Sequence, residues 1–471
     1  MVLLVSMERN CRRGGRRTAM VGAVMALVLG AGGALAEPLA DAVRAAVTQN
    51  PAQRAANADV QASAFELLAL QGEFLPTLSL FGDAGANYVN APGRLSAANN
   101  GQTRLTAEVG IAAEYTIFDG YRRANLVYRG AAQVDGAIFR LLDASETMAL
   151  NAVEAYIDVM RHRHLRSVMA QNLARHHAIG RQVKDLVAGG RLPAADGFTI
   201  DERTLAARLA LLDVERALAD AEARYEAVIG HAPHGGMAVP HVTGLPNSLQ
   251  VLTVKAVENS FQVRYANTLV RQTYYEQGIG EADLLPEVKL RAGVTYGTNQ
   301  GGNSGSETDA FVGLQFRWEF FTGGRQPRRA AYTQRTREAM AERDEVVRDV
   351  QELAARAWNG YHTNLSRVQL IDRQLHASRE IVEQYKDQFE AGTRSLLDLL
   401  SAERSYYNVR FQDVSAEASL AFSRYKLLAA QSRLASHFGI QPAEIPLDPT
   451  FQDRAKGNPA AIFRTDLPAL E

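Results

Sequence analysis

The segment Arg104–Gly120, RLTAEVGIAAEYTIFDG, decides how the rest of this sequence is interpreted. Apolar side chains occupy every second position from Leu105 to Ile117, and charged, polar or small side chains occupy the positions between them. A period of two over this length is typical of a strand with two different faces. The segment therefore predicts a two-faced strand that ends at Phe118-Asp119-Gly120.

Three other segments alternate in the same way: Thr77–Tyr88, Glu287–Tyr296 and Val312–Phe320. Phe81 is an exception, because its aromatic side chain falls among the polar positions. Segments of about ten residues, apolar on one face and charged or small on the other, are typical of membrane barrels with an aqueous interior. A soluble antiparallel sheet packed on helices shows the same alternation and stays open as an alternative.

Aromatic residues near the strand ends are candidates for contact with the two membrane interfaces. Tyr88 and Tyr296 fall at one end of the paired strands, and Tyr115 and Trp318 fall at the other. The connections 89–102 and 297–309 are rich in Gly, Asn and Ser, which suits an exposed outer rim. Since the smallest membrane barrels have about eight strands, several chains must share one barrel.

The chain also repeats itself. Val109–Gly120 aligns without a gap with Val312–Gly323, and the turn sequence Ala188–Arg191 matches Ala391–Arg394. Three colinear matches, including a helical segment before each Leu-Pro, indicate an internal duplication. The predicted domains are a signal peptide at 1–36, a first repeat at 37–243, a second repeat at 244–440 and a Pro-rich tail at 441–471. Each repeat is predicted to contain a helix, two strands and a long helical hairpin.

The helices of these hairpins are too long for a compact globule. No proline interrupts residues 121–187 or 328–389, so each could form one helix on the order of 90 to 100 Å long. Apolar positions on the second helix recur at nearly the period of a straight α-helix. Two long hairpins packed side by side are expected, and a solid coiled-coil rod is the alternative.

The N-terminus predicts export from the cytoplasm. Arg12, Arg13, Arg16 and Arg17 precede a short apolar core, and Ala34-Leu35-Ala36 resembles a cleavage site, so cleavage after Ala36 is expected. The only cysteine, Cys11, would be removed with this segment. The chain has 51 basic and 52 acidic residues, a formal net charge of −1, which does not favour a nucleic-acid partner.

Together, the layout and the motifs resemble the TolC-like family of outer-membrane channels across essentially the whole mature chain. Phe118-Asp119-Gly120, its copy Phe321-Thr322-Gly323 and the turn Ala391–Asp398 carry the resemblance. It implies an α+β membrane protein in which each chain contributes four strands to a trimeric 12-strand transmembrane β-barrel. The barrel would join a long α-helical barrel that extends from the outer membrane into the periplasm, in contact with outer-membrane lipid.

The resemblance also implies roles for residues at the hairpin turns. Asp196 and Arg394 resemble an ion pair that closes the periplasmic gate, and Asp398 resembles an acidic ring in the pore. Gly190 and Gly392 would lie at the tip that docks a periplasmic adaptor protein. Two positions depart from the family pattern, because Phe389 replaces a gate tyrosine and Ser401 replaces a second ring aspartate. Asp196 and Asp398 also fit a local role at helix starts.

The predicted function is a passive export duct, with no enzymatic activity and no cofactor. An inner-membrane ABC exporter for type I protein secretion is the first expected partner, and a proton-driven pump for drug or metabolite efflux is the second. A secreted structural coiled-coil protein is an alternative from another class. Pairs of histidines at 162 and 164, 176 and 177, and 231 and 234 lack neighbouring Cys or acidic ligands, so surface positions are expected and no metal site is predicted.

Overall fold

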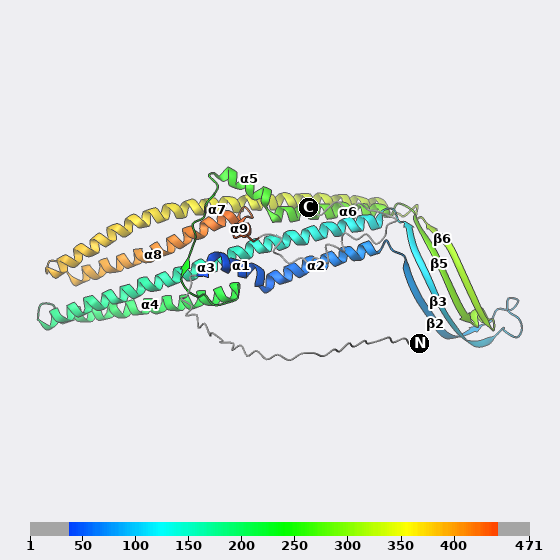
Figure 1. Ribbon diagram of the computed structural model, residues 1–471, viewed down its shortest axis with the longest axis horizontal. Helices are drawn as coiled ribbons and strands as arrows, with labels where there is room; N and C mark the ends of the chain where they lie inside the picture. The colour runs from blue at the N-terminus through cyan, green and yellow to red at the C-terminus, as the bar shows by residue number, and fades with distance from the viewer. Residues whose placement is uncertain (1–36, 441–471) are drawn as a thin grey trace, which may run out of the picture. The chain divides into compact units, whose positions relative to one another are not determined.

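The computed structural model describes residues 37–440, which form one unit of long helices and a four-stranded sheet (Figure 1). The predicted signal peptide and the Pro-rich tail lie outside the described residues. Within the described range, none of the helices combines the length and the apolar character needed to cross a membrane.

The helices and strands follow one another in an order that occurs twice. The first set is β1 (Glu37–Pro38), α1 (Leu39–Gln49), α2 (Pro51–Gly72), β2 (Thr77–Val89), β3 (Gln102–Phe118), α3 (Arg122–Ala188) and α4 (Ala194–Ile229). The second set is β4 (Met237–Ala238), α5 (Leu249–Asn259), α6 (Phe261–Ala282), β5 (Glu287–Thr298), η1 (Gln300–Gly302), β6 (Ser306–Arg317), α7 (Arg325–Glu390), α8 (Leu396–Ala429) and α9 (Leu434–His437). The exact domain boundaries remain a prediction.

The four longer strands form one antiparallel sheet in the order β2-β3-β5-β6. Leu80 lies opposite Ile111, which lies opposite Val294, and Val294 lies opposite Ala310. Directly opposed residues of an antiparallel sheet share a face. The apolar positions of all four strands therefore form one continuous face.

The last strand occupies different residues from those predicted. β6 begins at Ser306 and ends at Arg317, whereas the alternating pattern continued to Phe320. Arg317 lies opposite Glu287, the first residue of β5, and Pro286 before it has no N–H to donate. Residues 318–320 therefore have no strand to pair with, and the end of the predicted loop, from Ser306, becomes strand instead.

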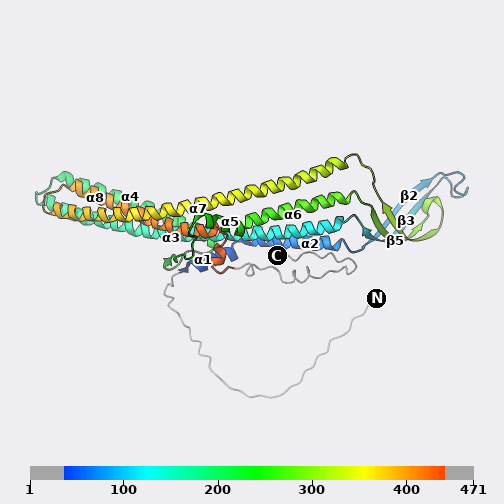
Figure 2. The same ribbon diagram turned by 90° about the horizontal axis from the view of Figure 1, so that it is seen from above.

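The two long helices have 67 residues in α3 and 66 in α7, about 100 Å each at 1.5 Å per residue. α7 begins at Arg325, before the predicted start, because Pro327 falls in the first turn, where no intrahelical N–H bond is required. α3 packs against α4, α2, α6 and α8, and α7 packs against α8, α6 and α5. The hairpins α3–α4 and α7–α8 run side by side in both views (Figures 1 and 2).

The apolar core is divided into several small clusters along the helices. The largest lies where α1, α3, α4, α8 and α9 meet, and it contains the fully buried rings of Tyr156, Tyr225 and Tyr425. Two of these hydroxyls donate to backbone carbonyls, Tyr156 to Glu37 at 2.6 Å and Tyr425 to Pro240 at 3.0 Å. These bonds attach the segment before α1 and the segment after α4 to the long helices.

Candidate functional site

The apolar face of the sheet is not covered by the rest of the chain. Leu78 on β2, Leu105 on β3 and Val312 on β6 are each at least 74% exposed. A contiguous exposed apolar surface marks contact with a membrane or with another protein. Because the exposed side chains recur on all four strands, the face provides one continuous apolar surface for such a contact.

The opposite face carries charged side chains in contact with one another. The Lys289 ammonium lies 3.0 Å from Glu114 and 3.1 Å from Glu287, and the Arg291 guanidinium lies 3.4 Å from Glu114. These groups come from β3 and β5 at the end of the sheet that leads into the helices. Charged side chains of an ion pair can remain in contact with water, so this face fits an aqueous interior.

The exception noted at Phe81 has a packing explanation. Phe81 lies opposite Gly110, and a β-carbon at Gly110 would come within 2.6 Å of the Phe81 ring. Phe311 covers Gly293 in the same way, at 2.7 Å. Each ring therefore lies over a strand position without a side chain, so aromatic residues on this face pack on the sheet itself.

The four predicted interface aromatics all lie on the apolar side or immediately beyond it. Tyr88 and Tyr296 are near the ends of β2 and β5 that lead into the loops, whereas Tyr115 is near the other end of β3. Trp318 follows β6, and its indole N–H donates to the Leu284 carbonyl at 3.1 Å. Their contact with a membrane remains a prediction.

The motif Phe118-Asp119-Gly120 forms the junction between β3 and α3. The Asp119 carboxylate accepts from the Arg123 backbone N–H at 3.0 Å and from its Nε at 2.8 Å, while Arg123 also donates to the Thr116 carbonyl. Gly120 has φ +69°, and a β-carbon there would come within 2.7 Å of the Ala282 carbonyl. The motif therefore sets the angle at which the helix leaves the sheet.

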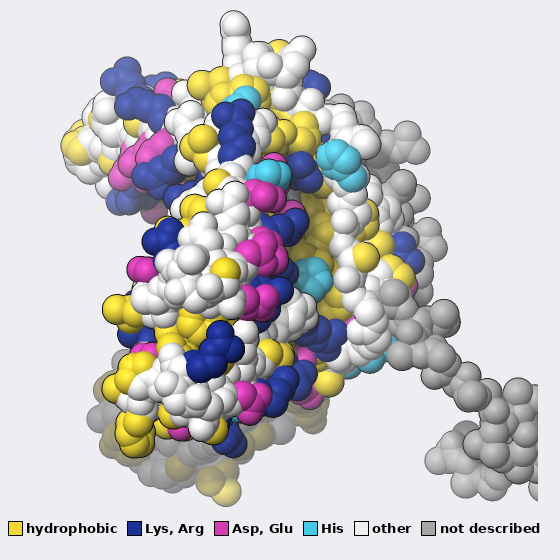
Figure 3. Space-filling model, turned by 90° about the vertical axis from the view of Figure 1, so that its left-hand side faces the viewer, with side chains coloured by type: hydrophobic (Ala, Val, Ile, Leu, Met, Phe, Trp, Pro, Cys, Tyr) yellow, Lys and Arg dark blue, Asp and Glu magenta, His cyan; other side chains and the backbone are white. Residues whose placement is uncertain are grey.

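The turns at the far ends of the two hairpins have the same backbone. After α3, Arg191 N–H donates to the Leu186 carbonyl at 2.9 Å, and after α7, Thr393 N–H donates to the Gln388 carbonyl at 2.9 Å. Gly190 and Gly392 adopt φ +69° and +75°, in the left-handed region that favours glycine. Figure 3 views this end, where side chains of both charges are interspersed.

Asp398 is held at the start of α8. The Asp398 backbone N–H donates to Ser395 Oγ at 3.2 Å, and the Ser395 hydroxyl donates to the Asp398 carboxylate at 2.8 Å. Arg394 Nε donates to Gln388 at 3.1 Å, and its guanidinium lies 4.0 Å from the centre of the Tyr385 ring. The local role at a helix start is therefore realised at Asp398, whose carboxylate remains about half exposed.

Asp196 occupies the equivalent position at the start of α4, but with fewer side-chain contacts. Pro193 precedes this helix and makes no side-chain cap. Among the ion pairs of residues 37–440, Arg394 is paired with Asp398 at 3.9 Å, and none joins it to Asp196. The structure of one chain therefore does not bring the predicted gate pair together.

Sequence reasoning missed the contacts that join the two hairpins within one chain. Arg175 on α3 lies 2.6 Å from Glu403 on α8, whose side chain is only 2% exposed. Closer to the turns, an apolar cluster includes Val183, Ile200, Phe389 and Leu399. Phe389 is buried there, and its ring, unlike that of a tyrosine, has no hydroxyl group that needs a hydrogen-bond partner. Arg175 and Glu403 are far apart in the sequence, so only knowledge of which helices pack together could have identified this ion pair.

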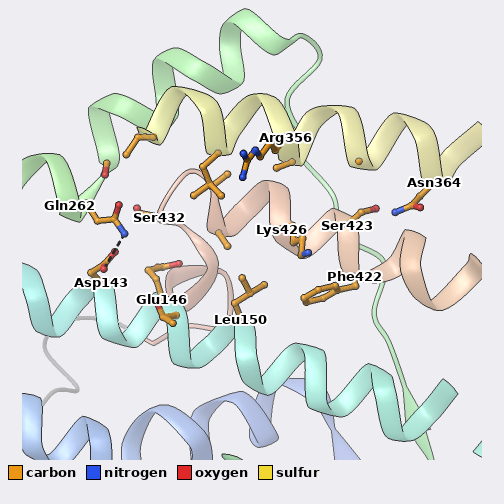
Figure 4. Close-up of a pocket in the computed structure, with 18 of the residues that line it drawn as sticks. Asp143, Glu146, Leu150, Gln262, Arg356, Asn364, Phe422, Ser423, Lys426 and Ser432 are labelled. Carbon is orange, nitrogen blue, oxygen red and sulfur yellow. Dashed lines mark hydrogen bonds between the residues drawn. The ribbon is translucent and has the colours of Figure 1, made fainter. Parts of the chain in front are cut away.

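A cavity of about 550 Å³ lies between α3, α7 and α8, and Glu146 and Asp143 line it (Figure 4). The Glu146 carboxylate accepts from the backbone N–H groups of Leu434 and Ala435, at 2.8 and 3.1 Å, and so holds the start of α9. Burial raises the pKa of Glu146 to about 7, against the lowering effect of these two bonds.

The histidines differ in their positions. His162 and His176 are buried in α3, each with Nδ1 2.9 Å from the carbonyl four residues earlier, so the expected surface position is wrong for these two. The helix face they occupy packs against other helices, which the pair spacing did not reveal. His231 and His234 are more exposed, and Glu37 lies beside them.

Comparison with known proteins identifies similar sequences. The family described as "Outer membrane efflux protein" matches residues 252–431. BepC, an outer membrane efflux protein of Brucella suis biovar 1 (strain 1330), is 26% identical over 349 residues, covering 72% of this chain and 75% of BepC. The outer membrane protein TolC of Vibrio cholerae is 25% identical over 166 residues, covering 33% of this chain and 35% of TolC.

The fold also matches solved structures. The outer membrane protein VceC of Vibrio cholerae superimposes with a TM-score of 0.71 and 16% sequence identity, covering 84% of this chain and 96% of VceC. At this level of identity the match is evidence for the fold. The predicted combination of a helical hairpin array and a four-strand sheet is therefore confirmed, whereas closure of a barrel remains a prediction.

Proposed function

We propose that this chain, a TolC-like outer-membrane channel protein located in the outer membrane and extending into the periplasm, is the duct of a tripartite export system. The observation that best supports this proposal is the sheet, which has one uncovered apolar face and one charged face. Such a sheet suits a wall between lipid and water. Four strands require further copies, so three chains would supply one 12-strand barrel.

Exposed apolar stripes on the helices support assembly of several chains. On α4 the stripe contains Phe198, Leu205, Leu209 and Leu212, and on α7 it contains Leu370 and Ile381. Each set lies along one face at the helical period. Packing between neighbouring chains would bury these stripes and would place the hairpins around a common axis.

The sheet provides a direct test of membrane insertion. An arginine on the lipid face near the bilayer centre destabilises a barrel by about 2–4 kcal/mol. Leu314→Arg should therefore reduce the amount of heat-modifiable trimer in the outer-membrane fraction. Gln315→Arg, the neighbouring residue on the polar face, is the matched control and should assemble normally. Equal assembly of both variants would contradict the assigned faces.

We also propose that the turns form the gate and the adaptor-docking tip. Three Asp398 carboxylates around a pore would attract cations. Asp398→Asn keeps an acceptor for Ser395 but removes the charge, so block by multivalent cations in planar bilayers should weaken. Unchanged block would leave Asp398 with the local role alone. Because Asp196 and Arg394 are not paired within one chain, we propose that they pair between chains.

A charge exchange tests that pair. Asp196→Arg should raise the closed-state conductance, and adding Arg394→Asp should lower it again. Failure of the double variant to restore the low conductance would contradict pairing between chains. Docking at the turns around Gly190 and Gly392 predicts that crosslinks to a periplasmic adaptor form from these residues and not from the sheet loops.

For the cargo, we propose efflux of small molecules driven by an inner-membrane pump, because BepC and the matching family are both described as efflux proteins. Type I protein secretion is the second candidate, favoured by the absence of any cysteine after Cys11 that could carry a lipid. Deleting the gene should increase drug sensitivity in the first case. In the second case, a secreted protein should disappear from the medium while drug sensitivity remains unchanged.

A further inference from the structure

We propose that Glu37, His231 and His234 bind a divalent transition metal ion of the zinc class. Glu37 belongs to β1, and the two histidines lie between α4 and β4. The Glu37 carboxylate lies 3.6 Å from His231 Nε2 and 3.4 Å from His234 Nδ1. All three candidate ligand atoms lie within 4.8 Å of one another.

These distances fit a shared ion. Zinc binds imidazole nitrogen and carboxylate oxygen at about 2.0–2.2 Å in tetrahedral sites. Two ligands of a regular tetrahedron with such bonds lie about 3.3–3.6 Å apart. The contacts of Glu37, from Oε1 to His231 and from Oε2 to His234, are each close to that separation. Small side-chain rotations would bring the three atoms around one ion and leave a fourth position for water.

The backbone around the three residues is firmly held. Glu37 N–H donates to the Gly236 carbonyl at 3.0 Å, and β1 pairs with β4 in parallel. Arg163 on α3 donates to the Gly235 and Pro233 carbonyls, at 3.0 and 3.2 Å. These contacts fix the loop before any ion arrives, and a site arranged in advance loses less conformational entropy on binding.

The orientation of His231 suits a metal ligand. Its Nδ1 lies 3.2 Å from the Ala232 carbonyl, which can accept the ring proton and leave the Nε2 lone pair facing Glu37. His234 Nδ1 lies 3.4 Å from the same carbonyl as well as near Glu37. An ion at this nitrogen would displace a proton, so binding should weaken at acidic pH.

The charge balance also favours a cation. The Glu37 side chain is 4% exposed, and its ion pairs within residues 37–440 are with His231 and His234. A buried carboxylate is stable only when it is paired or coordinated. Arg163 is nearby but pairs with Glu222 at 3.3 Å, and the neighbouring Tyr156 and Tyr225 carry no charge at neutral pH.

The site would connect distant parts of the chain. Glu37 and His234 are 197 residues apart in sequence. An ion between them would fix the residue before α1 to the segment that follows the first hairpin. A crosslink that closes a long loop reduces the entropy of the unfolded chain. The proposed role is therefore structural, and it does not depend on which cargo the duct exports.

The test uses the full-length protein purified in detergent and treated with EDTA. Titration with ZnCl₂ in a calorimeter should show one ion per chain, and Co²⁺ should give the visible absorption of a four-coordinate site. His231→Ala and His234→Ala should each abolish stoichiometric binding. His241→Ala, a nearby exposed histidine, is the matched control and should bind normally.

Thermal unfolding provides a second measurement. Added Zn²⁺ should raise the unfolding midpoint of the unchanged protein and of His241→Ala, but not of His231→Ala combined with His234→Ala. The proposal is overturned if the unchanged protein binds no stoichiometric Zn²⁺, or if the double variant binds as tightly as the control. In that event the three residues form only ion pairs between imidazolium and carboxylate.

Discussion

The turn between α3 and α4 and the turn between α7 and α8 share a backbone but differ in their side chains. Gly190 and Gly392 have nearly the same left-handed conformation, whereas Ser395 caps α8 and Pro193 at the equivalent position makes no such bond. The two turns therefore share the path of the backbone, while the contacts of their two acids differ. Asp398 has a local partner, and Asp196 remains available for a contact with another chain.

The buried ion pair between the two hairpins, Arg175 with Glu403, lies away from both turns, and its loss should give the largest effect. Arg175→Ala would leave a buried carboxylate without its ion pair, which costs about 3–5 kcal/mol. Denaturant unfolding should show the loss, and the conductance should rise as the hairpins separate. Arg166→Ala, which breaks an exposed pair on the same helix, should cost less than about 1 kcal/mol. Similar losses in both would remove the special role of Glu403.

The start of α9 is also held by a carboxylate, that of Glu146, and burial changes the pKa of this group. The folded state raises the pKa of Glu146 from 4.5 to about 7, because burial disfavours the charged form. Between these values the folded state binds more protons than the unfolded state, so the free energy of unfolding falls as the pH rises from about 4.5 to about 7. The loss amounts to about 3 kcal/mol at most.

Glu146→Gln should remove this part of the pH dependence, as measured by unfolding at a series of pH values. Glu154→Gln is the control on the same helix, where the carboxylate pairs with Arg224 near the surface. If Glu146→Gln keeps the slope of the unchanged protein, another group is responsible for it.

The two turn glycines should respond alike. Gly190→Ala and Gly392→Ala would each force a β-carbon into the left-handed region and cost about 1–2 kcal/mol. Nothing lies within 4 Å of either added carbon, so the cost is one of backbone conformation alone. Gly197→Ala, inside α4 and equally open, should stabilise the chain by up to about 1 kcal/mol. Clearly unequal losses of stability would contradict the equivalence of the two backbone conformations.

The caps should respond differently. Ser395→Ala removes the acceptor for the Asp398 N–H and should cost about 1 kcal/mol. Pro193→Ala removes no side-chain bond and should have a smaller effect on thermal stability. Equal destabilisation by the two substitutions would contradict the difference in side-chain capping between the two turns.

Much of the fold could be predicted from local patterns. Alternation identified all four strands, and uninterrupted helical periodicity identified α3 and α7. The predicted end of β6 was wrong, because the end of this strand depends on where its partner β5 begins, at Glu287 after a proline. Phe81 fitted no local pattern, because the glycine that accommodates its ring lies on another strand.

The candidate sites were less accessible to sequence reasoning for the same reason. Asp398 could be recognised because its partner Ser395 is three residues away. Arg175 and Glu403 are 228 residues apart, and Glu37 and His234 are 197 residues apart, so no local pattern includes either pair. The predicted absence of a metal site considered only neighbours along the chain, whereas the fold places a carboxylate beside both imidazoles.

We propose that several copies of this chain form one water-filled channel across the outer membrane. The most direct measurement is the electrical conductance of planar lipid bilayers to which the purified, detergent-solubilised protein is added. Discrete conductance steps are expected from the trimer fraction, and larger steps from Arg175→Ala. A protein that remains in the aqueous phase, or trimers that leave the bilayer conductance unchanged, would contradict the formation of a channel.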